Sequence, residues 1–564
     1  MPPWSRRGRP PLVWSFSAVG AVPLRKCSIG GFSAFQWRFS GSLQNLATRA
    51  RGRSGVNLIK LGAVATVAAS ALAAGAAGAS PAAAAGPAAP ASHSAASATN
   101  GGWGNAREVP GSAALNTGGS AGVHQVSCGS AGNCVAAGSY AAGGHAHPFV
   151  TEEKNGTWGK AHAIPGVAVL SGGRGAGAHF VSCTSAGNCA VVGTYADAGG
   201  AVQWFAADEK NGAWQSAIKI PGLAKLATAH ESLVNSLSCA SAGNCAVAGS
   251  YRTTDNASHA FVADEKNFTW QRAIEVPGIR ALNSDSGAEA DAVSCASAGN
   301  CAVAGSYNDP VTNNLHAFVD DESGGTWGQG HAVPGADTLG PGEATAVSCA
   351  SAGNCAVTGD YTDSAFSQQV FVADETGGTW GPAQALPGLA AQNVSGHAEA
   401  VAISCPAPGN CATGGTFSGL FNLTPDTEAY VADERQGSWD LAAQVFGPPP
   451  FNNGSLVTVL RSLSCGSVGN CAAGGSFATQ SIGFPVYVVN EVNGSWGNAI
   501  QLPGIVALNK GLESDVSSIS CPSPGNCAVG GFYTDANGHD QAFVANQTTA
   551  ASAAGAAPAH GSSP

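Results

Sequence analysis

Short stretches in which apolar and polar residues alternate, separated by Gly, Asn and Ser, fill most of the chain after residue 100. Within residues 288–335 they read AVSC, GNCAVAGSY, HAFVDDE and TWGQGHAVPG in turn. Stretches this short, without an apolar period of about 3.6 residues between them, predict β-strands rather than helices. This segment therefore predicts four strands joined by turns.

The four-strand unit recurs eight times along the chain, at a spacing of 54 to 60 residues. Each copy carries two cysteines six residues apart, Gly-Asn before the second cysteine, and one tryptophan. Repeated units bury their apolar faces against each other, and four strands per unit is typical of a β-propeller. The cysteine pairs are Cys128 and Cys134, Cys183 and Cys189, Cys239 and Cys245, Cys295 and Cys301, Cys349 and Cys355, Cys405 and Cys411, Cys465 and Cys471, and Cys521 and Cys527; the tryptophans are Trp103, Trp158, Trp214, Trp270, Trp327, Trp380, Trp439 and Trp496.

The two ends of the repeat region complement each other. Residues 101–111 read as a fourth strand without the first three, and residues 519–547 read as three strands without a fourth. Pairing of the two ends would close a ring, whereas an open array would need capping units at its ends. We therefore predict an all-β fold, an eight-bladed β-propeller over residues 101–547 in which the N- and C-terminal strands share one blade.

The N-terminal part has the composition of an export signal. Residues 1–99 contain ten Lys or Arg and no Asp or Glu, and basic residues precede an apolar run over residues 61–79. Small residues such as Ala77-Gly78-Ala79 are candidate cleavage sites. We predict a basic leader over residues 1–55, upstream of a candidate true start at Val56, a signal peptide over 56–85, a linker over 86–100 and a disordered tail over 548–564. A retained membrane anchor is the alternative, but after cleavage we expect no stable membrane insertion.

The net charge argues against one class of partner, and the cysteine spacing indicates the compartment. After residue 99 the chain has 14 basic and 35 acidic residues, a net charge of −21, which argues against a nucleic-acid partner. Sixteen cysteines in eight equally spaced pairs, behind an export signal, predict eight local disulfides and a secreted protein. Metal binding and free thiols are the alternatives, although the cysteine spacing is wider than in zinc knuckles.

The tryptophan turns carry a family resemblance. DESGGTW at residues 321–327 and DETGGTW at 374–380 resemble the Asp-box, S-x-D-x-G-x-T-W, of sialidase-like propellers, where the hairpin is structural. The whole unit is similar to secreted bacterial repeat proteins without an assigned activity. Aligned on the tryptophan, the aspartate of the box falls on Glu153, Glu209, Glu265, Glu322, Glu375, Glu434 and Glu491.

No catalytic constellation stands out from the repeats. A sialidase mechanism would need an arginine cluster, but the repeat region has seven scattered arginines, and the tyrosines recur at one strand position that is typical of packing. We interpret the protein as an exported, monomeric, non-catalytic binding or scaffold module for an extracellular glycan, peptide or cation. The alternative is a glycan-active hydrolase or lyase with a loop-built site, for which residues 446–461 are the irregular segment.

Carboxylates gather in the loops that we expect on the face opposite the cysteine loops. They could form a negative surface that attracts cations, with calcium as a candidate ion at Asp535, Asn537 and Asp540 and no other cofactor expected. Turn formation and solvated charge are the alternative roles. The candidate binding residues are Glu231, Glu289, Glu343, Glu399, Glu513, Asp197, Asp309, Asp363 and Asp535.

Overall fold

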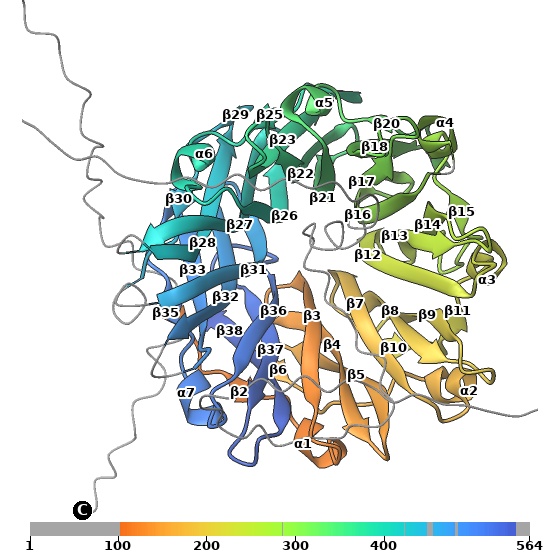
Figure 1. The fold of residues 1–564 in the computed structure, drawn as a ribbon. Coiled ribbons are helices and arrows are strands. Elements are labelled where there is room, and N and C mark those ends of the chain that lie inside the picture. The colour runs from red at the N-terminus through yellow and green to blue at the C-terminus, as the bar shows by residue number, and fades with distance from the viewer. Residues whose placement is uncertain (1–101, 285, 422–423, 448–454, 480–482, 549–564) are drawn as a thin grey trace, which may run out of the picture. The chain divides into compact units, whose positions relative to one another are not determined.

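The computed structural model describes residues 102–284, 286–421, 424–447, 455–479 and 483–548. Within these ranges the chain forms antiparallel sheets built from one repeated unit, together with seven one-turn helices (Figure 1). This confirms the predicted all-β fold of four-strand repeats.

One unit shows the common plan. Strand β16 (Ala288–Ser297) pairs with β17 (Asn300–Asn308), which pairs with β18 (Leu315–Ser323). The fourth strand consists of two short segments, β19 (Thr326–Trp327) and β20 (His331–Ala332), both paired with β18. The fourth strand is therefore shorter than the sequence predicted, because the backbone between the two segments leaves the sheet and bonds to the preceding unit.

The other units repeat this order. First strands are β3 (Ala121–Ser130), β7 (Ala176–Ser185), β12 (Glu231–Ser241), β21 (Gly342–Ser351), β26 (Ala398–Ala407), β31 (Ser455–Ser467) and β36 (Ser514–Ser520). Second strands are β4 (Asn133–Ala142), β8 (Asn188–Ala196), β13 (Asn244–Arg252), β22 (Asn354–Thr362), β27 (Asn410–Phe421), β32 (Asn470–Thr479) and β37 (Ala528–Thr534). Third strands are β5 (His145–Lys154), β9 (Val202–Lys210), β14 (Ser258–Asp264), β23 (Gln368–Thr376), β28 (Thr424–Arg435), β33 (Val486–Val492) and β38 (Asp540–Thr548).

Two-residue segments make up the outer strands. They are β1 (Gly102–Trp103), β2 (Arg107–Glu108), β6 (Thr157–Trp158), β10 (Ala213–Trp214), β11 (Ile218–Lys219), β15 (Ile274–Glu275), β24 (Thr379–Trp380), β25 (Gln384–Ala385), β29 (Ser438–Trp439), β30 (Ala443–Gln444), β34 (Ser495–Trp496) and β35 (Ile500–Gln501). The hydrogen-bonded sheets number seven in the described ranges, because the units of β28 and β31 are joined by one parallel pair, Thr427 with Val457.

Short helices follow the outer strands, and the sequence pattern does not predict them. Each begins after a glycine with positive φ, such as Gly278 at 83°, and has only four or five residues. An apolar period cannot reveal so short a helix. The helices are α1 (Ser112–Leu115), α2 (Val167–Ser171), α3 (Leu223–Leu226), α4 (Ile279–Asn283), α5 (Ala336–Leu339), α6 (Leu389–Gln392) and α7 (Ile505–Leu508).

The two ends of the described chain share one sheet, as their complementary sequences predicted. Gly102 and Trp103 of β1 pair with Thr548 and Gln547 of β38. Strand β2 pairs with the same strand further along, and β38 continues through β37 to β36. We call this sheet the closing unit.

A ring of hydrogen bonds joins the first strands of neighbouring units. In each unit, the serine before the first cysteine accepts a hydrogen bond from the N–H of the first cysteine in the next unit, at 2.9 to 3.1 Å. The last bond joins the closing unit to β3, so the series returns to its start. Among the described residues the bonds run from Cys183 to Ser127, Cys239 to Ser182, Cys295 to Ser238, Cys349 to Ser294, Cys405 to Ser348, Cys465 to Ser404, Cys521 to Ser464 and Cys128 to Ser520.

A second series joins the outer strands in the same order. The N–H of Gly330 donates to the carbonyl of Pro277 in the preceding unit at 2.8 Å, and Ala106 donates to Pro503 at 2.7 Å across a boundary of the closing unit. Equivalent bonds join Ala161 to Pro110, Ala217 to Pro165, Ala273 to Pro221, Ala383 to Pro334, Ala442 to Pro387 and Ala499 to Phe446. Each unit is thus attached to the next at its inner and its outer edge.

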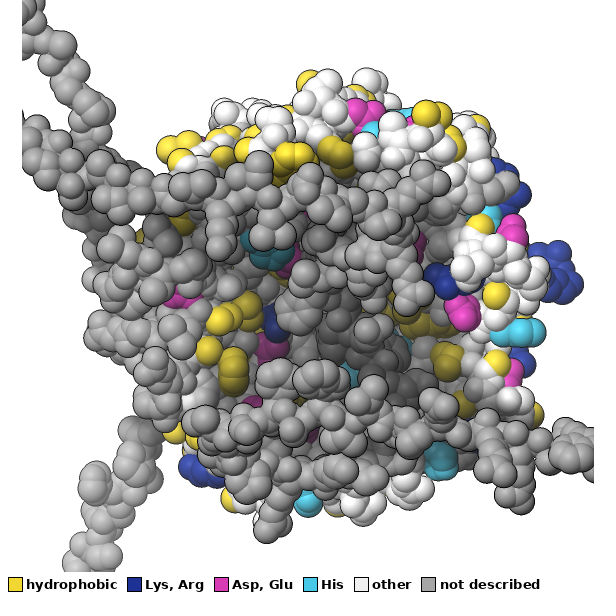
Figure 2. All heavy atoms as spheres, in the orientation of Figure 1, with side chains coloured by type: hydrophobic (Ala, Val, Ile, Leu, Met, Phe, Trp, Pro, Cys, Tyr) yellow, Lys and Arg dark blue, Asp and Glu magenta, His cyan; other side chains and the backbone are white. Residues whose placement is uncertain are grey.

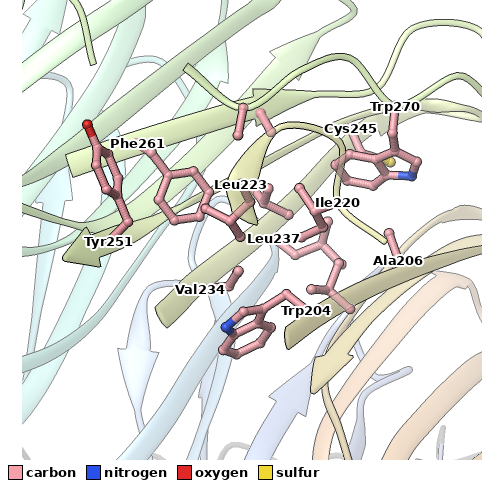
Figure 3. Packing of buried hydrophobic residues seen from close by; sticks show 14 of the residues in the cluster. Trp204, Ala206, Ile220, Leu223, Val234, Leu237, Cys245, Tyr251, Phe261 and Trp270 are labelled. Atoms are coloured by element: carbon pink, nitrogen blue, oxygen red, sulfur yellow. The ribbon is translucent and has the colours of Figure 1, made fainter. Parts of the chain in front are cut away.

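Apolar side chains fill the space between neighbouring units. Figure 3 shows one such boundary. Trp204 of one unit and Leu223 of the helix that follows it face Leu237 and Phe261 of the next unit, and all four side chains are buried. The recurring tyrosine, here Tyr251, packs in the same cluster, which confirms its role in packing. Burial of such side chains is worth roughly 1.5–3 kcal/mol each.

The eight predicted disulfides are present within the described residues, each between the two cysteines of one unit. Their Cα atoms lie 3.9 to 4.1 Å apart, since the two cysteines flank a tight hairpin. None of the helices in the described parts of the chain has the length and hydropathy that a membrane span requires.

We expect replacement of Cys295 and Cys301 by alanine to lower the free energy of unfolding by roughly 2 kcal/mol. The disulfide closes a loop of only seven residues, counting both cysteines, so its effect on the entropy of the unfolded chain is small. Urea unfolding of the oxidised protein and of the double variant measures the difference. Since Ser294 and its ring bond are kept, a loss far above this value would mean that the disulfide also maintains the boundary between units.

Candidate functional site

Every first strand contains a β-bulge at the same place. In β16 the register with β17 shifts between Ala290 and Ala292, so that Asp291 is the extra residue of the bulge. The same shift occurs in the other seven units. Bulges re-aim one side chain and are common beside functional sites. The eight bulged residues are His124, His179, Asn235, Asp291, Thr345, Val401, Arg461 and Ser517.

These bulged side chains lie between neighbouring first strands. His124 Nδ1 lies 2.6 Å from the carbonyl of Ala178, and Thr345 Oγ1 donates to the carbonyl of Ala400 at 3.0 Å, in each case in the next unit. Unlike the serine of the inner bonds, the bulged residue differs in every unit except the first two. We define the bulge ring as these eight residues and the residues two positions before them. On the face drawn in Figure 2, acidic, basic and histidine side chains are visible in places, together with hydrophobic ones.

Carboxyl groups gather on one part of the bulge ring. Glu343 pairs across the strands with Asp360, and Asp360 Oδ1 accepts the N–H of Ala400 at 2.7 Å. Burial raises the pKa of Asp360 well above its usual range, and the negative charges of Glu343 and Glu399 raise it further. The other units have Ser, Thr or Phe at the position of Asp360. The unit that contains Glu343 and Asp360 and the next unit, which contains Glu399, therefore bring three carboxyl groups close together.

Histidines occupy the first two positions of the bulge ring. The rings of His124 and His179 stack with centroids 5.4 Å apart, and Trp204 lies against His179 at 5.5 Å. Burial lowers the pKa of both imidazoles, and the proximity of His124 contributes to lowering that of His179 to about 3. The pair is neutral near pH 7 and offers aromatic faces rather than charge.

The one arginine of the bulge ring is paired. Arg461 Nε lies 3.0 Å from Asp515 Oδ2 in the closing unit. Of the other arginines, Arg252 pairs with Glu231, Arg280 with Glu275, and Arg435 with Asp433 and Asp440. These pairs lie in different units, so they provide no common binding point for an anionic substrate.

The structure separates the predicted binding residues into three groups. Glu289, Glu343 and Glu399 lie in the bulge ring, each two residues before a bulged residue. Glu231 begins β12 and lies 3.6 Å from Arg252, and Glu513 precedes β36 and bridges to Phe484.

The four predicted aspartates lie instead in the hairpins between second and third strands. Asp535 Oδ1 accepts the N–H groups of Asn537 at 2.8 Å and His539 at 3.0 Å. These bonds to backbone amides lower the pKa of the Asp535 carboxyl. Asp197, Asp309 and Asp363 accept equivalent amide hydrogen bonds. They form turns, which is the structural role that the sequence analysis gave as the alternative.

The proposed calcium ligands show the same local bonding. Besides the turn made by Asp535, Asp540 Oδ1 accepts a hydrogen bond from Thr534 at 2.9 Å. In the described ranges no group of three or more His, Cys, Asp or Glu side chains is placed to hold a metal ion. Calcium binding there stays a prediction. Within the irregular segment proposed for a catalytic site, residues 446–461, residues 448–454 lie outside the described residues.

The tryptophan turn is held by the cysteine loop of its own unit. In the fourth unit the N–H of Gly325 donates to the carbonyl of Gly299 at 2.8 Å, and the N–H of Gly324 to Asn300 Oδ1 at 3.3 Å. This bonding explains why Gly-Asn precedes the second cysteine, a role that the sequence analysis missed. It also puts the cysteine loops and tryptophan turns on one face, away from the hairpins between second and third strands.

Antiparallel four-strand units joined in a closed series define this chain as a protein of the β-propeller class. No protein-family model and no curated protein matches the sequence. Similar solved structures include YCF48 from Cyanidioschyzon merolae, at 12% identity over 64% of this chain and 92% of that one with a TM-score of 0.35. The α-L-arabinanase of Penicillium chrysogenum has 12% identity over 56% and 93% of the two chains and a TM-score of 0.33. A puromycin-hydrolysing peptidase of Mycobacterium tuberculosis has 12% identity over 76% and 61%, with a TM-score of 0.37. Likenesses this low assign neither a function nor a ligand.

Proposed function

We propose that this protein is an exported, non-catalytic binding module that holds its ligand at the bulge ring. One observation carries the proposal: a bulge recurs in all eight first strands, and its residue varies while the surrounding scaffold repeats. A position that only maintained the fold would be expected to repeat as the serine of the inner bonds does. Eight local disulfides suit an oxidising compartment, which supports export.

The chemistry of the bulge ring favours a positively charged ligand. Glu289, Asp291, Glu343 and Glu399 lie on consecutive units, and Glu343 and Glu399 lie close to the buried Asp360. The only Lys or Arg of the ring, Arg461, is paired with Asp515. Acidic groups converging from several strands attract cations, and the stacked histidines add flat faces for an apolar or sugar ring. Among glycans, this combination suits amino sugars rather than acidic ones.

A glycan array compares oligosaccharides of glucosamine, which carry ammonium groups, with those of N-acetylglucosamine, which do not. We expect the full chain to bind the cationic series, and the double variant Glu343→Gln, Glu399→Gln to bind it at least about tenfold more weakly, a loss of about 1.4 kcal/mol. Asp440→Asn is the matched control, because Asp440 is exposed in an outer connection and pairs with Arg435.

Equal binding by the double variant and the wild type would place the ligand elsewhere. A panel of chromogenic glycosides tests the alternative of a glycan-active hydrolase. Turnover of any glycoside that the bulge-ring variants abolish would contradict the non-catalytic proposal.

A further inference from the structure

A pair of acidic side chains lies at most boundaries between units. The third strand of a typical unit ends in Asp-Glu, as in Asp264-Glu265 and Asp321-Glu322. The aspartate of one unit faces the glutamate of the next, which gives the pairs Asp208 with Glu265, Asp264 with Glu322, Asp321 with Glu375, Asp374 with Glu434, and Asp433 with Glu491. The boundary before them pairs Glu152 with Glu209.

The tryptophan of the next unit binds the same aspartate. Trp327 Nε1 donates to Asp264 at 3.1 Å, Trp380 to Asp321 at 2.9 Å, and Trp496 to Asp433 at 3.0 Å. The glutamates are almost fully buried, with 2% of Glu265 and 3% of Glu434 exposed. Each Asp–Glu boundary therefore buries two carboxyl groups. The indole N–H of the next unit donates to the aspartate at four of these boundaries, whereas Trp270 Nε1, beside Asp208 and Glu265, has no hydrogen-bond partner.

One donor is missing from this arrangement. Both carboxyl oxygens of Glu265 and Glu434, and one oxygen each of Asp208 and Asp374, have no hydrogen-bond partner. Two ionised carboxylates cannot bond to each other, but a protonated one donates to its neighbour and satisfies both. Buried polar groups without partners are costly, so a single proton per boundary is the simplest completion.

The closing unit replaces these acids by amides. Asn546 stands at the aspartate position and donates to Glu153, and it accepts the N–H of Trp158 at 2.9 Å. At the other boundary Asn490 accepts the N–H of Trp103 at 3.1 Å, and Gln547 stands at the glutamate position. An amide supplies its own donor and does not titrate. The two boundaries that close the ring thus have no pair of carboxyl groups.

We propose that a shared proton holds the two units together at each Asp–Glu boundary, so that these boundaries weaken as the pH rises, whereas the boundary of Asn490 with Gln547, which has amides at both positions, does not. The fold is therefore most stable at acidic pH. At alkaline pH it is destabilised at the Asp–Glu boundaries. No metal ion is needed for this behaviour.

The direction follows from the titration of the pairs. Burial, with the neighbouring aspartate, raises the pKa of Glu265 to about 9, of Glu491 to about 8, and of Glu322 to about 7. A carboxyl whose pKa is raised on folding stabilises the fold below its unfolded value, near 4.3, and loses that effect as the pH rises through the folded value. The stabilisation of the fold by these protonated carboxyls is therefore lost between about pH 5 and about pH 9. The histidines of the bulge ring act in the opposite direction, because their pKa is lowered on folding.

Charged neighbours distinguish the boundaries. Lys266 lies 3.8 Å from Glu322, His331 acts on Asp321, and Arg435 lies 3.2 Å from Asp433. At the Asp208–Glu265 pair the acting groups are the two carboxyls and Trp270, and Lys210 lies over the ring of Phe268. This pair is the clearest place for a test.

Thermal unfolding of the full chain is followed at pH 5, 7 and 9 in EDTA for the wild type and for Glu265→Gln. Glutamine copies the natural Gln547 and donates to Asp208 without a titrating proton. We expect the same Tm at pH 5 and a Tm a few degrees higher for the variant at pH 9. The converse variant, Asn546→Asp, creates a carboxyl pair with Glu153 and should lower the Tm at pH 9 more than at pH 5.

Two results would overturn the proposal. A Glu265→Gln difference that is equal at pH 5 and pH 9 would show that the pair shares no titrating proton. A calcium-dependent rise in the wild-type Tm at pH 9 that Glu265→Gln removes would show that a cation, rather than a proton, joins the carboxyls.

Discussion

Gly305→Ala is expected to lower the free energy of unfolding by about 3 kcal/mol or more, the upper range for overpacking a buried site. Gly305 lies in β17 directly beside the bulge of β16. A Cβ atom there would lie 2.1 Å from the carbonyl oxygen of Glu289 and 2.9 Å from the ring of Phe318. The obstacle is backbone, so the two strands would have to separate.

The same close approach occurs in every unit, which explains why this glycine recurs. The corresponding distances to the carbonyl of the facing strand are 1.9 to 2.1 Å at Gly138, Gly193, Gly249, Gly359, Gly415, Gly475 and Gly531. The bulge that aims the variable side chains therefore requires a residue without a side chain opposite it. Urea unfolding of Gly305→Ala measures the cost.

Gly175→Ala is the matched control, because an added Cβ at Gly175 meets no atom within 4 Å and the residue directly precedes β7. We expect it to leave stability unchanged or to raise it by a few tenths of a kcal/mol through the unfolded state. Equal losses in both variants would mean that the bulge is not tightly packed.

The features that the sequence predicted correctly are those with a local signal. The strand alternation, the spacing of Cys295 and Cys301, and the incomplete units at the two ends can each be read without knowing what lies beside them. Their physical basis is short-range, since a hairpin brings the two cysteines together whatever the rest of the fold does.

The features that it missed depend on neighbours distant in sequence. Ser294 accepts a hydrogen bond from a residue 55 positions away. Asp264 accepts a hydrogen bond from Trp327, which belongs to another unit. The helices were missed because a single turn, such as α4, has no periodicity to detect. A column-by-column comparison of the eight units would have shown that the serine repeats and that the residue three positions before it varies.

The candidate site was partly predicted for the same reason. Glu289, Glu343 and Glu399 were found from their acidity, but His124, Asp360 and the other bulged residues were not. Their importance comes from the bulge and from strand pairing, which place them beside the next unit. Conversely, Asp309 and Asp363 were selected by charge, although their carboxylates are used by the turns that they begin.

Deletion of residues 102–111 is expected to destabilise all units together. It removes β1 and β2 from the closing unit, and with them the buried Trp103 and Val109. Truncation of one buried tryptophan costs about 3–5 kcal/mol, and the deletion also removes the pairing with β38 and the bond from Ala106 to Pro503. In a closed ring every unit is supported from both sides, so loss of one closure weakens the whole. Arg107→Ala, an exposed change within the same segment, should have little effect.

Hydrogen exchange of the deletion variant, measured by mass spectrometry for peptides from each unit, tests the closed ring most directly. The account predicts that protection of the second strands, from β4 to β37, falls by a similar factor in every unit, in parallel with a single thermal transition at a lower Tm. Protection lost only in β36, β37 and β38 and in the adjoining β3, with the other units unchanged, would contradict it and show an open array of independent units.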